Sequence, residues 1–146
     1  MTAISRSALV PYSAQEMSAL VVDIESYPRF LPWCEGARIL SQNATETIAC
    51  LDIAYQGIHN SFTTRNERKG DEIIEMHLVK GPFRHLHGIW EFQELEDTAS
   101  KISLSLEFTF SSKMLDVAFK PAFIRVASGL VDSFTKRAMD LYGSRE

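Results

Sequence analysis

The chain has 146 residues, of which 45% are hydrophobic and 23% are charged, a composition typical of one folded domain rather than of a disordered chain. Fifteen basic and nineteen acidic residues give a formal net charge of −4, which argues against a general nucleic-acid binder, because such proteins carry a basic excess. The sequence has no membrane-spanning run of ~18 apolar residues and no disulfide framework, so we predict one cytoplasmic domain over residues 1–146.

The first predicted elements are a strand over residues 3–10 and a helix from about Ala14 to Asp23. The strand shows a weak alternation of apolar and polar residues. The helix begins with a capping box, in which the Ser13 hydroxyl accepts from the Glu16 N–H and the Glu16 carboxylate accepts from the Ser13 N–H. Residues 25–32 contain two prolines, so we predict a short helical turn and then an extended corner.

The middle of the chain alternates with period two, which is typical of strands that bury one face. The last of these strands is the clearest, because Ile102, Leu104, Leu106, Phe108 and Phe110 all fall on one side. The connections are too short for parallel crossovers, so neighbouring strands are predicted to pair as antiparallel hairpins. The predicted strands are 37–42, 46–55, 58–69, 72–80, 88–96 and 100–111.

The end of the chain is predicted to form a long helix with a continuous apolar stripe. Pro121 suits its first turn, with room for a short helical segment before it, and Gly143 suits its end. Gly129 lies beside the stripe, which predicts that a strand or a ligand approaches the helix backbone closely there. The stripe consists of Phe119, Phe123, Val126, Leu130, Phe134, Ala138 and Leu141.

This order of elements predicts an α+β fold, in which a seven-stranded antiparallel sheet curves round one long C-terminal helix. Short helices lie between the first and second strands. A curved sheet that grips a single helix leaves a gap lined by aromatic and aliphatic side chains, as ligand pockets are. From the residues alone, a filled core and an open pocket both remain possible.

The chain resembles the helix-grip fold of START-like domains, the polyketide cyclase/dehydrase and lipid transport superfamily. Within it, the sequence is similar to the branch of coenzyme-Q-binding proteins and bacterial ribosome association toxins. Pro32-Trp33-Cys34 together with Gly81-Pro82-Phe83 is the more specific part of this likeness. The similar stretches are Val10–Met17, Tyr27–Cys34, Gly81–Phe83 with Leu86, Gly88 and Trp90, and Leu130–Phe134 with Arg137, Ala138, Tyr142 and Gly143.

The resemblance implies a hydrophobic tunnel between the sheet and the long helix, which holds ubiquinone or a similar lipid without covalent chemistry. It implies no required cofactor and a role in respiratory quinone function, with peripheral membrane contact as one route to the ligand. The alternative is a protein that binds the large ribosomal subunit and blocks subunit association. A cyclase or dehydrase enzyme is the least expected member of this set.

The expected ligand site is the tunnel wall and its mouth. The corner 28–34 and the segment 81–87 are the candidate gates. The turn at Gly81–Phe83, with Phe83 at its tip, is equally an entrance loop or an ordinary hairpin turn. The bulky corner at Phe30–Trp33 can equally be a core plug at a tight turn. The expected lining residues are Phe30, Leu31, Trp33, Phe62, Phe83, Leu86, Trp90, Phe92, Phe108, Phe110, Phe123, Val126, Leu130 and Phe134.

Charged side chains offer a second candidate surface. Arg65, Arg68 and Lys69 could contact ribosomal RNA or anionic lipid. Acidic residues at 67, 71, 72 and 75 are interleaved with them, which favours a neutralised surface. Asp52 lies on an otherwise apolar strand, and we favour an outward, solvated position for it.

The sequence provides no set of catalytic residues. The G-x-S-x-G, H-E-x-x-H and P-loop motifs are absent. His85 and His87 share one face of a strand, but two imidazoles do not make a zinc site and no third ligand lies at a convincing spacing. We therefore predict a binding protein that has no metal and is not an enzyme.

Overall fold

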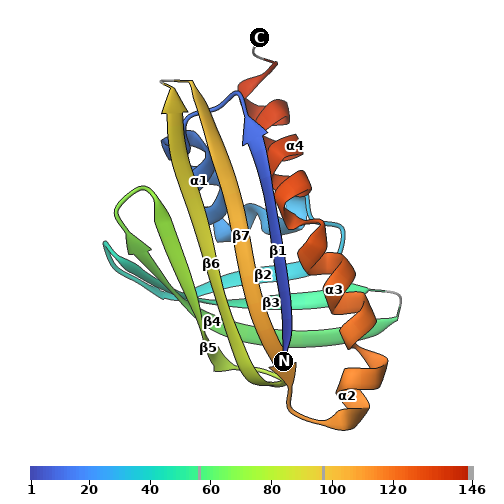
Figure 1. The fold of residues 1–146 in the computed structure, drawn as a ribbon. Helices are drawn as coiled ribbons and strands as arrows, with labels where there is room; N and C mark the ends of the chain where they lie inside the picture. The colour runs from blue at the N-terminus through green and yellow to red at the C-terminus, as the bar shows by residue number, and fades with distance from the viewer. Residues whose placement is uncertain (56, 97, 145–146) are drawn as a thin grey trace.

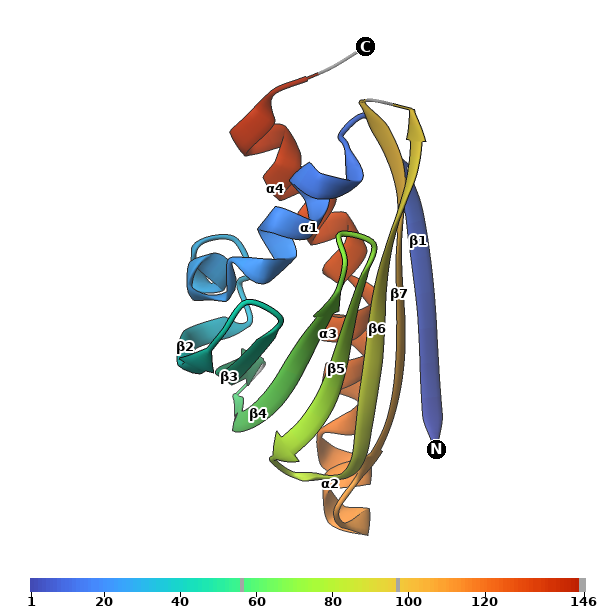
Figure 2. The ribbon, with the colours of Figure 1, turned by 90° about the vertical axis from the view of Figure 1, so that its left-hand side faces the viewer.

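The computed structural model describes residues 1–55, 57–96 and 98–144, and within them a curved seven-stranded sheet partly encloses a C-terminal helical rod (Figure 1). The curvature lets one face of the sheet pack against both the rod and the short helices near the N-terminus (Figure 2). The elements are β1 (Thr2–Val10), α1 (Ala14–Val22), the 3₁₀ helix η1 (Ile24–Arg29), β2 (Cys34–Gln42), β3 (Glu46–Tyr55), β4 (Ile58–Lys69), β5 (Ile73–Lys80), β6 (Phe83–Glu96), β7 (Ala99–Phe110), α2 (Lys113–Ala118), α3 (Lys120–Ser128) and α4 (Leu130–Tyr142).

The sheet is an antiparallel meander from β2 to β7, with β1 added at the edge beside β7. The strand order is β1-β7-β6-β5-β4-β3-β2, and β1 pairs with β7 along its whole length, from Thr2 opposite Phe108 to Val10 opposite Ser100. The predicted α+β class, the antiparallel hairpins and the bounds of β3 and β4 are confirmed.

The interpretation of the segment 81–87 as an entrance loop is wrong. Strand β6 begins at Phe83, five residues before its predicted start, because Phe83 already pairs with Phe110. The Phe83 side chain is buried and its ring stacks on that of Phe110, with 4.8 Å between the centroids. Most of the predicted loop is therefore strand, and Phe83 belongs to the core rather than to a loop tip.

The start of α1 follows the predicted capping box. Ser13 Oγ accepts from the Glu16 N–H at 3.1 Å, and Glu16 Oε1 accepts from the Ser13 N–H at 3.0 Å. The helix buries Met17, Leu20 and Val21 against the sheet. The prolines of the next segment limit it to the short 3₁₀ helix η1, as expected.

The C-terminal rod consists of three consecutive helices. Pro121 lies in the first turn of α3, and Gly143 follows α4 with a φ of 83°. Gly129 marks the join between α3 and α4. Among the described residues no strand approaches Gly129 closely, because a Cβ there would meet only the carbonyl oxygens of Arg125 and Val126, at 3.5 and 3.9 Å; approach by a ligand stays a prediction.

Two clusters of buried side chains form the core. One gathers around α1, η1 and α4 and contains Met17, Leu31 and Phe134. The other gathers around α2 and α3 at the opposite end of the sheet and contains the rings of residues 83, 108, 110, 119 and 123. Trp33 and Met76 pack against both clusters. The space between the clusters is where a cavity can form.

Candidate functional site

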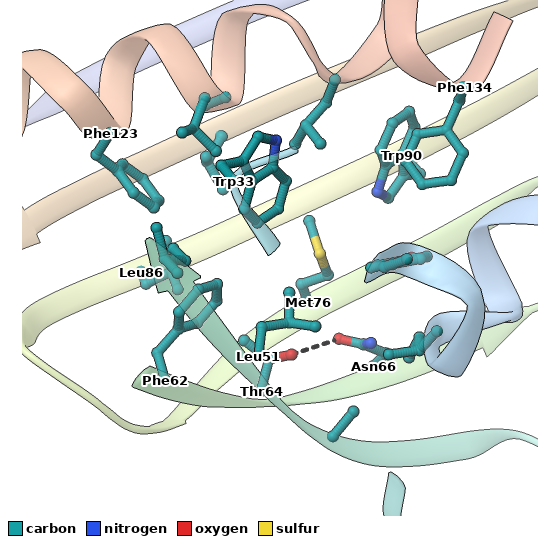
Figure 3. Close-up of a pocket in the computed structure, with 18 residues that line it drawn as sticks. Trp33, Leu51, Phe62, Thr64, Asn66, Met76, Leu86, Trp90, Phe123 and Phe134 are labelled. Carbon is teal, nitrogen blue, oxygen red and sulfur yellow. Dashed lines mark hydrogen bonds between the residues drawn. The ribbon is translucent and has the colours of Figure 1, made fainter. Parts of the chain in front are cut away.

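A cavity of about 80 Å³ lies between the inner face of the sheet and the helical rod (Figure 3). Strands β3 to β7 form one wall, because every second residue of each strand points inward. The rod forms the facing wall, and η1 with the corner that follows it closes one side. The lining residues are Ile24, Tyr27, Trp33, Ala49, Leu51, Ile53, Phe62, Thr64, Asn66, Met76, Leu86, Trp90, Leu106, Phe123, Val126, Ala127, Leu130 and Phe134.

Eight of the expected lining residues do lie on the cavity wall: Trp33, Phe62, Leu86, Trp90, Phe123, Val126, Leu130 and Phe134. The others do not line it. Leu31, Phe83, Phe92, Phe108 and Phe110 are buried in the two core clusters. The remaining one, Phe30, is partly buried and packs edge-on against Phe134, with the Arg137 guanidinium 5.0 Å from its ring centroid. Ligand contact by any of these side chains stays a prediction.

The residues of the corner after η1 take both of the roles that the sequence left open, core plug and cavity wall. Leu31 is fully buried and serves as a core plug. Trp33 lines the cavity and is partly exposed, so its indole separates the cavity from solvent. The Trp33 carbonyl accepts from the Ala54 N–H at 2.8 Å, which attaches this corner to β3. The corner 28–34 therefore keeps its place as the candidate gate.

The polar wall residues are the part of the site that the sequence missed. The Thr64 hydroxyl donates to Asn66 Oδ1 at 3.0 Å, and both residues face inward from β4. Period-two spacing from Phe62 would have placed them on this face, but polar residues in a strand usually indicate the outer face. No hydrogen bond from the Asn66 amide N–H groups is found among the described residues, so these groups could donate to a polar atom of a ligand.

A smaller cavity of about 30 Å³ adjoins the first at this polar end. The two share Ile24, Tyr27, Asn66, Met76 and Trp90, and the smaller one adds Thr47 and Arg68. The site is thus apolar in its centre and polar at one end. This gradient suits a molecule with a large hydrophobic body and a small polar head.

The cavity wall offers no acid–base pair. Among the described residues that line the larger cavity, none carries a carboxylate, an imidazole, an amine or a thiol. Tyr27 is the one phenol in this set, and its hydroxyl donates to the Val21 carbonyl. Burial, followed by the nearby Cys34 and Asp23, raises the pKa of Tyr27 well above its ordinary value. Tyr27 therefore stays neutral and fixes η1 to the end of α1.

Cys34 lies directly after the Trp33 gate and is buried. Burial raises the pKa of the Cys34 thiol to about 11. The folded-state pKa lies above the unfolded value of about 9. The neutral thiol therefore makes its full contribution to the free energy of unfolding below pH 9, and this contribution is lost as the pH rises through 11. The thiolate that reacts with disulfide reagents is accordingly scarce at neutral pH.

We expect the Cys34 thiol of a Cys50→Ala chain to react with a chromogenic disulfide reagent at pH 8 about 100-fold more slowly in the folded than in the unfolded state, because two pKa units lower the thiolate fraction by that factor. Stopped-flow absorbance measures both rates. The Cys34→Ala chain, in which Cys50 is the remaining thiol, is the matched control and gives the reaction rate of Cys50. Equal rates in the folded and unfolded chains would contradict the burial of Cys34.

The three basic residues expected as an anion contact are all paired with acidic residues, Arg65 and Lys69 on the outer face of the sheet and Arg68 beside the smaller cavity. Arg65 Nη1 lies 3.3 Å from Glu46 and 2.5 Å from Glu67, Arg68 lies 3.4 Å from Asp71, and Lys69 Nζ lies 2.6 Å from Glu75. The favoured interpretation of a neutralised surface is confirmed. Contact of this hairpin with a ribosome stays a prediction.

Asp52 points outward from β3, as favoured from the sequence, but it is paired rather than only solvated. Its carboxylate accepts from Ser61 Oγ at 2.6 Å and lies 3.3 Å from Arg38 Nη1. It cannot therefore orient a ligand inside the cavity.

Among the described residues, no helix combines the length and the hydropathy that crossing a membrane requires.

The chain matches the family model of polyketide cyclase / dehydrase and lipid transport over residues 10–135. It is 44% identical over 145 residues to the ribosome association toxin RatA of Escherichia coli K12, a match that covers 99% of this chain and 92% of that protein. It is 25% identical over 152 residues to the mitochondrial coenzyme Q-binding protein COQ10 homolog B of Xenopus laevis, covering 97% and 60%. The Zhui aromatase/cyclase from Streptomyces sp. R1128 has the same fold, with a TM-score of 0.82, 16% identity and 99% of each chain covered.

Proposed function

Because this chain belongs to the polyketide cyclase/dehydrase and lipid transport family, we propose that it binds a hydrophobic ligand, ubiquinone first among the candidates, without converting it. The observation that carries this proposal is the apolar cavity with a polar end formed by Thr64 and Asn66. The name of the Xenopus relative, a coenzyme Q-binding protein, supports the choice of a quinone. The absence of acid–base groups among the described lining residues supports binding without catalysis.

The size of the cavity requires an opening step. Its volume of about 80 Å³ is roughly half that of an engineered cavity that holds one benzene. A ring with an isoprenoid tail therefore enters only if the wall moves. The segment between η1 and β2, which carries Trp33, is the part of the wall that lies outside helices and strands. Each methylene of the tail buried there contributes ~0.8 kcal/mol.

Copurifying lipid is the direct test of this proposal. Organic extraction and mass spectrometry of the purified chain should yield a quinone in stoichiometric amount. Titration with ubiquinone gives a second readout, because both tryptophans of the chain, Trp33 and Trp90, line the cavity and a bound quinone should quench their fluorescence. Phe123→Glu, which places a charge in the cavity wall, should abolish quenching. Because Phe123 is buried and an unpaired charge there is costly, circular dichroism must show that the fold is retained. A chain that carries no lipid and ignores added quinone would contradict the proposal.

A second candidate function is association with the ribosome, and we propose it on the 44% identity to a relative named ribosome association toxin. Such a role would use the outer surface and would place the protein in the cytoplasm. The large subunit is the expected partner, as the resemblance of the sequence implies.

Cosedimentation with separated ribosomal subunits tests the second role. Binding to the large subunit should fall steeply with salt if the chain contacts phosphates. The chain with Arg65, Arg68 and Lys69 changed to glutamine should bind almost as well as the wild type, because the three side chains already face carboxylates. Loss of binding in that chain would instead assign the contact to this hairpin, and no binding at low salt would reject the role.

A further inference from the structure

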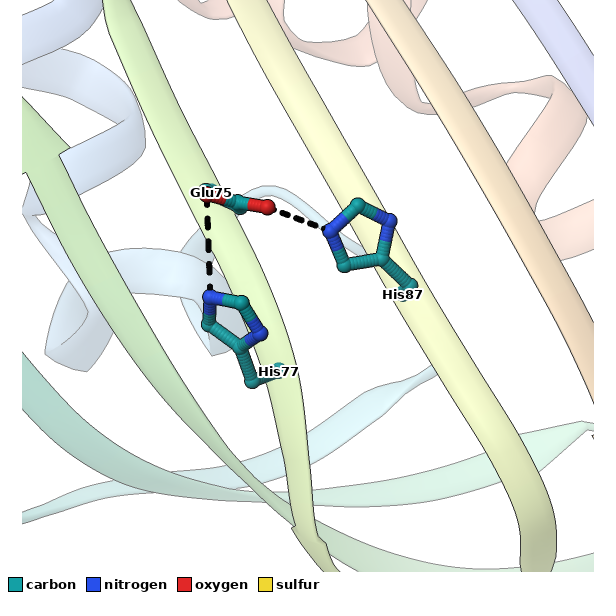
Figure 4. A group of neighbouring side chains, drawn as sticks. All are labelled: Glu75, His77 and His87. Carbon is teal, nitrogen blue, oxygen red and sulfur yellow. Dashed lines mark hydrogen bonds and ion pairs between the residues drawn. The ribbon is translucent and has the colours of Figure 1, made fainter.

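A group of metal-ligating side chains lies on the outer face of the sheet, on the opposite side from the cavity (Figure 4). Glu75 and His77 are two residues apart on β5, and His87 lies directly opposite His77 on β6. One ligand atom from each of the three lies within 4.8 Å of the others. Glu75 Oε2 is 2.6 Å from His87 Nε2, and Glu75 Oε1 is 3.7 Å from His77 Nε2.

A second carboxylate completes the group. Glu67 lies opposite Glu75 in the pairing of β4 with β5, and its Oε1 is 3.1 Å from His77 Nε2. Three neighbouring strands therefore bring two imidazoles and two carboxylates together, with Glu67 joining the group of three through its contact with His77. The four side chains are between 18% and 34% exposed, so the point is accessible to an ion but partly shielded from bulk water.

His77 provides the observation that points to a ligand. Its Nε2 atom is buried and makes no hydrogen bond among the described residues, although two carboxylate oxygens lie near it. Glu67 Oε1 lies 3.1 Å away but without hydrogen-bond geometry, so this buried nitrogen is poorly satisfied. A cation placed between His77 Nε2 and the carboxylates would satisfy all of them at once.

The sequence drew attention only to His85 and His87, for which it predicted no metal site. His85 and His87 share a face, but residues two apart on one strand are ~6.6 Å apart. Residues directly opposite on paired strands have Cβ atoms only ~4.5–5.5 Å apart. The rings of His77 and His87 accordingly lie 5.4 Å apart between centroids. Only the register of β5 with β6 brings these two imidazoles and Glu75 together.

We propose that Glu75, His77 and His87, with Glu67 as the fourth ligand, bind Zn²⁺. Imidazole nitrogen and carboxylate oxygen are ligands that zinc accepts, and four of them match its tetrahedral preference. Metal–ligand bonds of ~2.0–2.2 Å place the ligand atoms ~3.3–3.5 Å apart. For zinc to bind, the Glu75–His87 contact must widen from 2.6 Å and the Glu75–His77 contact must shorten from 3.7 Å, and all three ligand atoms, now within 4.8 Å of one another, must draw together.

Two cations compete with the metal for these carboxylates. Lys69 Nζ lies 2.6 Å from Glu75 Oε1, and Arg65 Nη1 lies 2.5 Å from Glu67 Oε1. Zinc must displace these contacts, so we expect a micromolar rather than a nanomolar dissociation constant. The competition also predicts that removing the Lys69 charge tightens zinc binding, by about threefold for a pair of this exposure.

Isothermal titration calorimetry of the untagged chain with Zn²⁺ tests the proposal. One ion per chain is the expected result, with His77→Gln and His87→Gln each weakening binding by at least ~10-fold. His85→Gln is the matched control, because it removes an imidazole from the same face of the same strand and should change nothing. Binding that is absent at millimolar Zn²⁺, or that His85→Gln weakens as much as His87→Gln, would overturn the site.

Two further readouts keep the test independent of folding. Zinc should raise the unfolding temperature of the wild type and of the Lys69→Gln chain but not that of His87→Gln, because only chains with the site gain stability from the ion. Cobalt, used as a spectroscopic substitute, should give visible bands typical of tetrahedral nitrogen and oxygen ligands. A thiolate-to-cobalt charge-transfer band would assign the metal to Cys34 or Cys50 and overturn the proposal.

Discussion

Replacing Phe134 with alanine is expected to lower the free energy of unfolding by about 3–5 kcal/mol. Its side chain is 1% exposed, and its ring meets those of Tyr27, Phe30 and Trp90 edge-on, with centroids 5.4, 5.2 and 5.3 Å away. Such aromatic pairs add to the free energy of burial. Loss of the ring removes the contact that joins α4 to η1 and to β6. Urea unfolding followed by circular dichroism measures the change.

An exposed position on the same helix provides the control for Phe134. Met139 is 55% exposed, so Met139→Ala should change the free energy of unfolding by less than about 0.5 kcal/mol. A loss below 1 kcal/mol for Phe134→Ala would show that the surrounding side chains collapse into the vacated space. In that event α4 would be held by contacts other than this ring.

Filling the cavity is expected to abolish ligand binding while the fold is retained. Ala127 lies on α3 at the cavity wall and is almost fully buried. In Ala127→Leu, three added carbon atoms enter a space of about 80 Å³, and a ligand can bind only by displacing them. When a ligand pushes the leucine atoms into the surrounding wall, that wall becomes overpacked at a cost of ~1–3 kcal/mol, and the ligand also loses its apolar contacts. We therefore expect affinity for ubiquinone to fall at least ~100-fold. Fluorescence quenching measures the affinity.

A second filling variant guards against local strain in the first. Ala49→Val places a larger side chain on the opposite wall of the cavity. Ala49 lies on β3, and a β-branched side chain suits a strand. Either variant should leave the unfolding temperature unchanged or raised, because filling a cavity commonly stabilises a fold. Quenching that persists in both stable variants would place the quinone elsewhere on the protein.

The filling variants also separate the two proposed functions. The proposed ribosome association would use the outer surface, so cosedimentation should be unaffected by Ala127→Leu. A filled and stable chain that no longer binds ribosomes would mean that the state of the cavity controls the outer surface. The two roles would then be steps of one activity rather than independent properties of one fold.

The sequence was informative about the sheet because the alternation of β7 and the turns around β3 and β4 are local signals. The start of β6 was missed, since Gly81 and Pro82 complete the turn sooner than the pattern indicated and Phe83 pairs at once. Local patterns define which segments are strands. They do not define how far a pairing extends into the residues beside a turn.

The cavity was harder to predict than the core around it. Large aromatic residues indicated burial correctly, yet Phe92 and Phe108 fill space while Trp90 borders it. A cavity lies where side chains are small, and nothing in the pattern of residues marks Ala49 or Ala127 as part of its wall. The outer group of Glu75, His77 and His87 depends on strand register, which no single segment encodes.

The pairing of β1 with β7 has a kinetic consequence. Its partners, such as Thr2 and Phe108, lie about a hundred residues apart in the chain, and closing so long a loop delays pairing more than forming a hairpin does. The strands from β2 to β7 join neighbours through short turns and can form first. During synthesis the opening strand must wait for the final one to emerge. β1 can therefore pair only after β7 has been synthesised, and its addition to the edge of the sheet is expected to be a late step in folding.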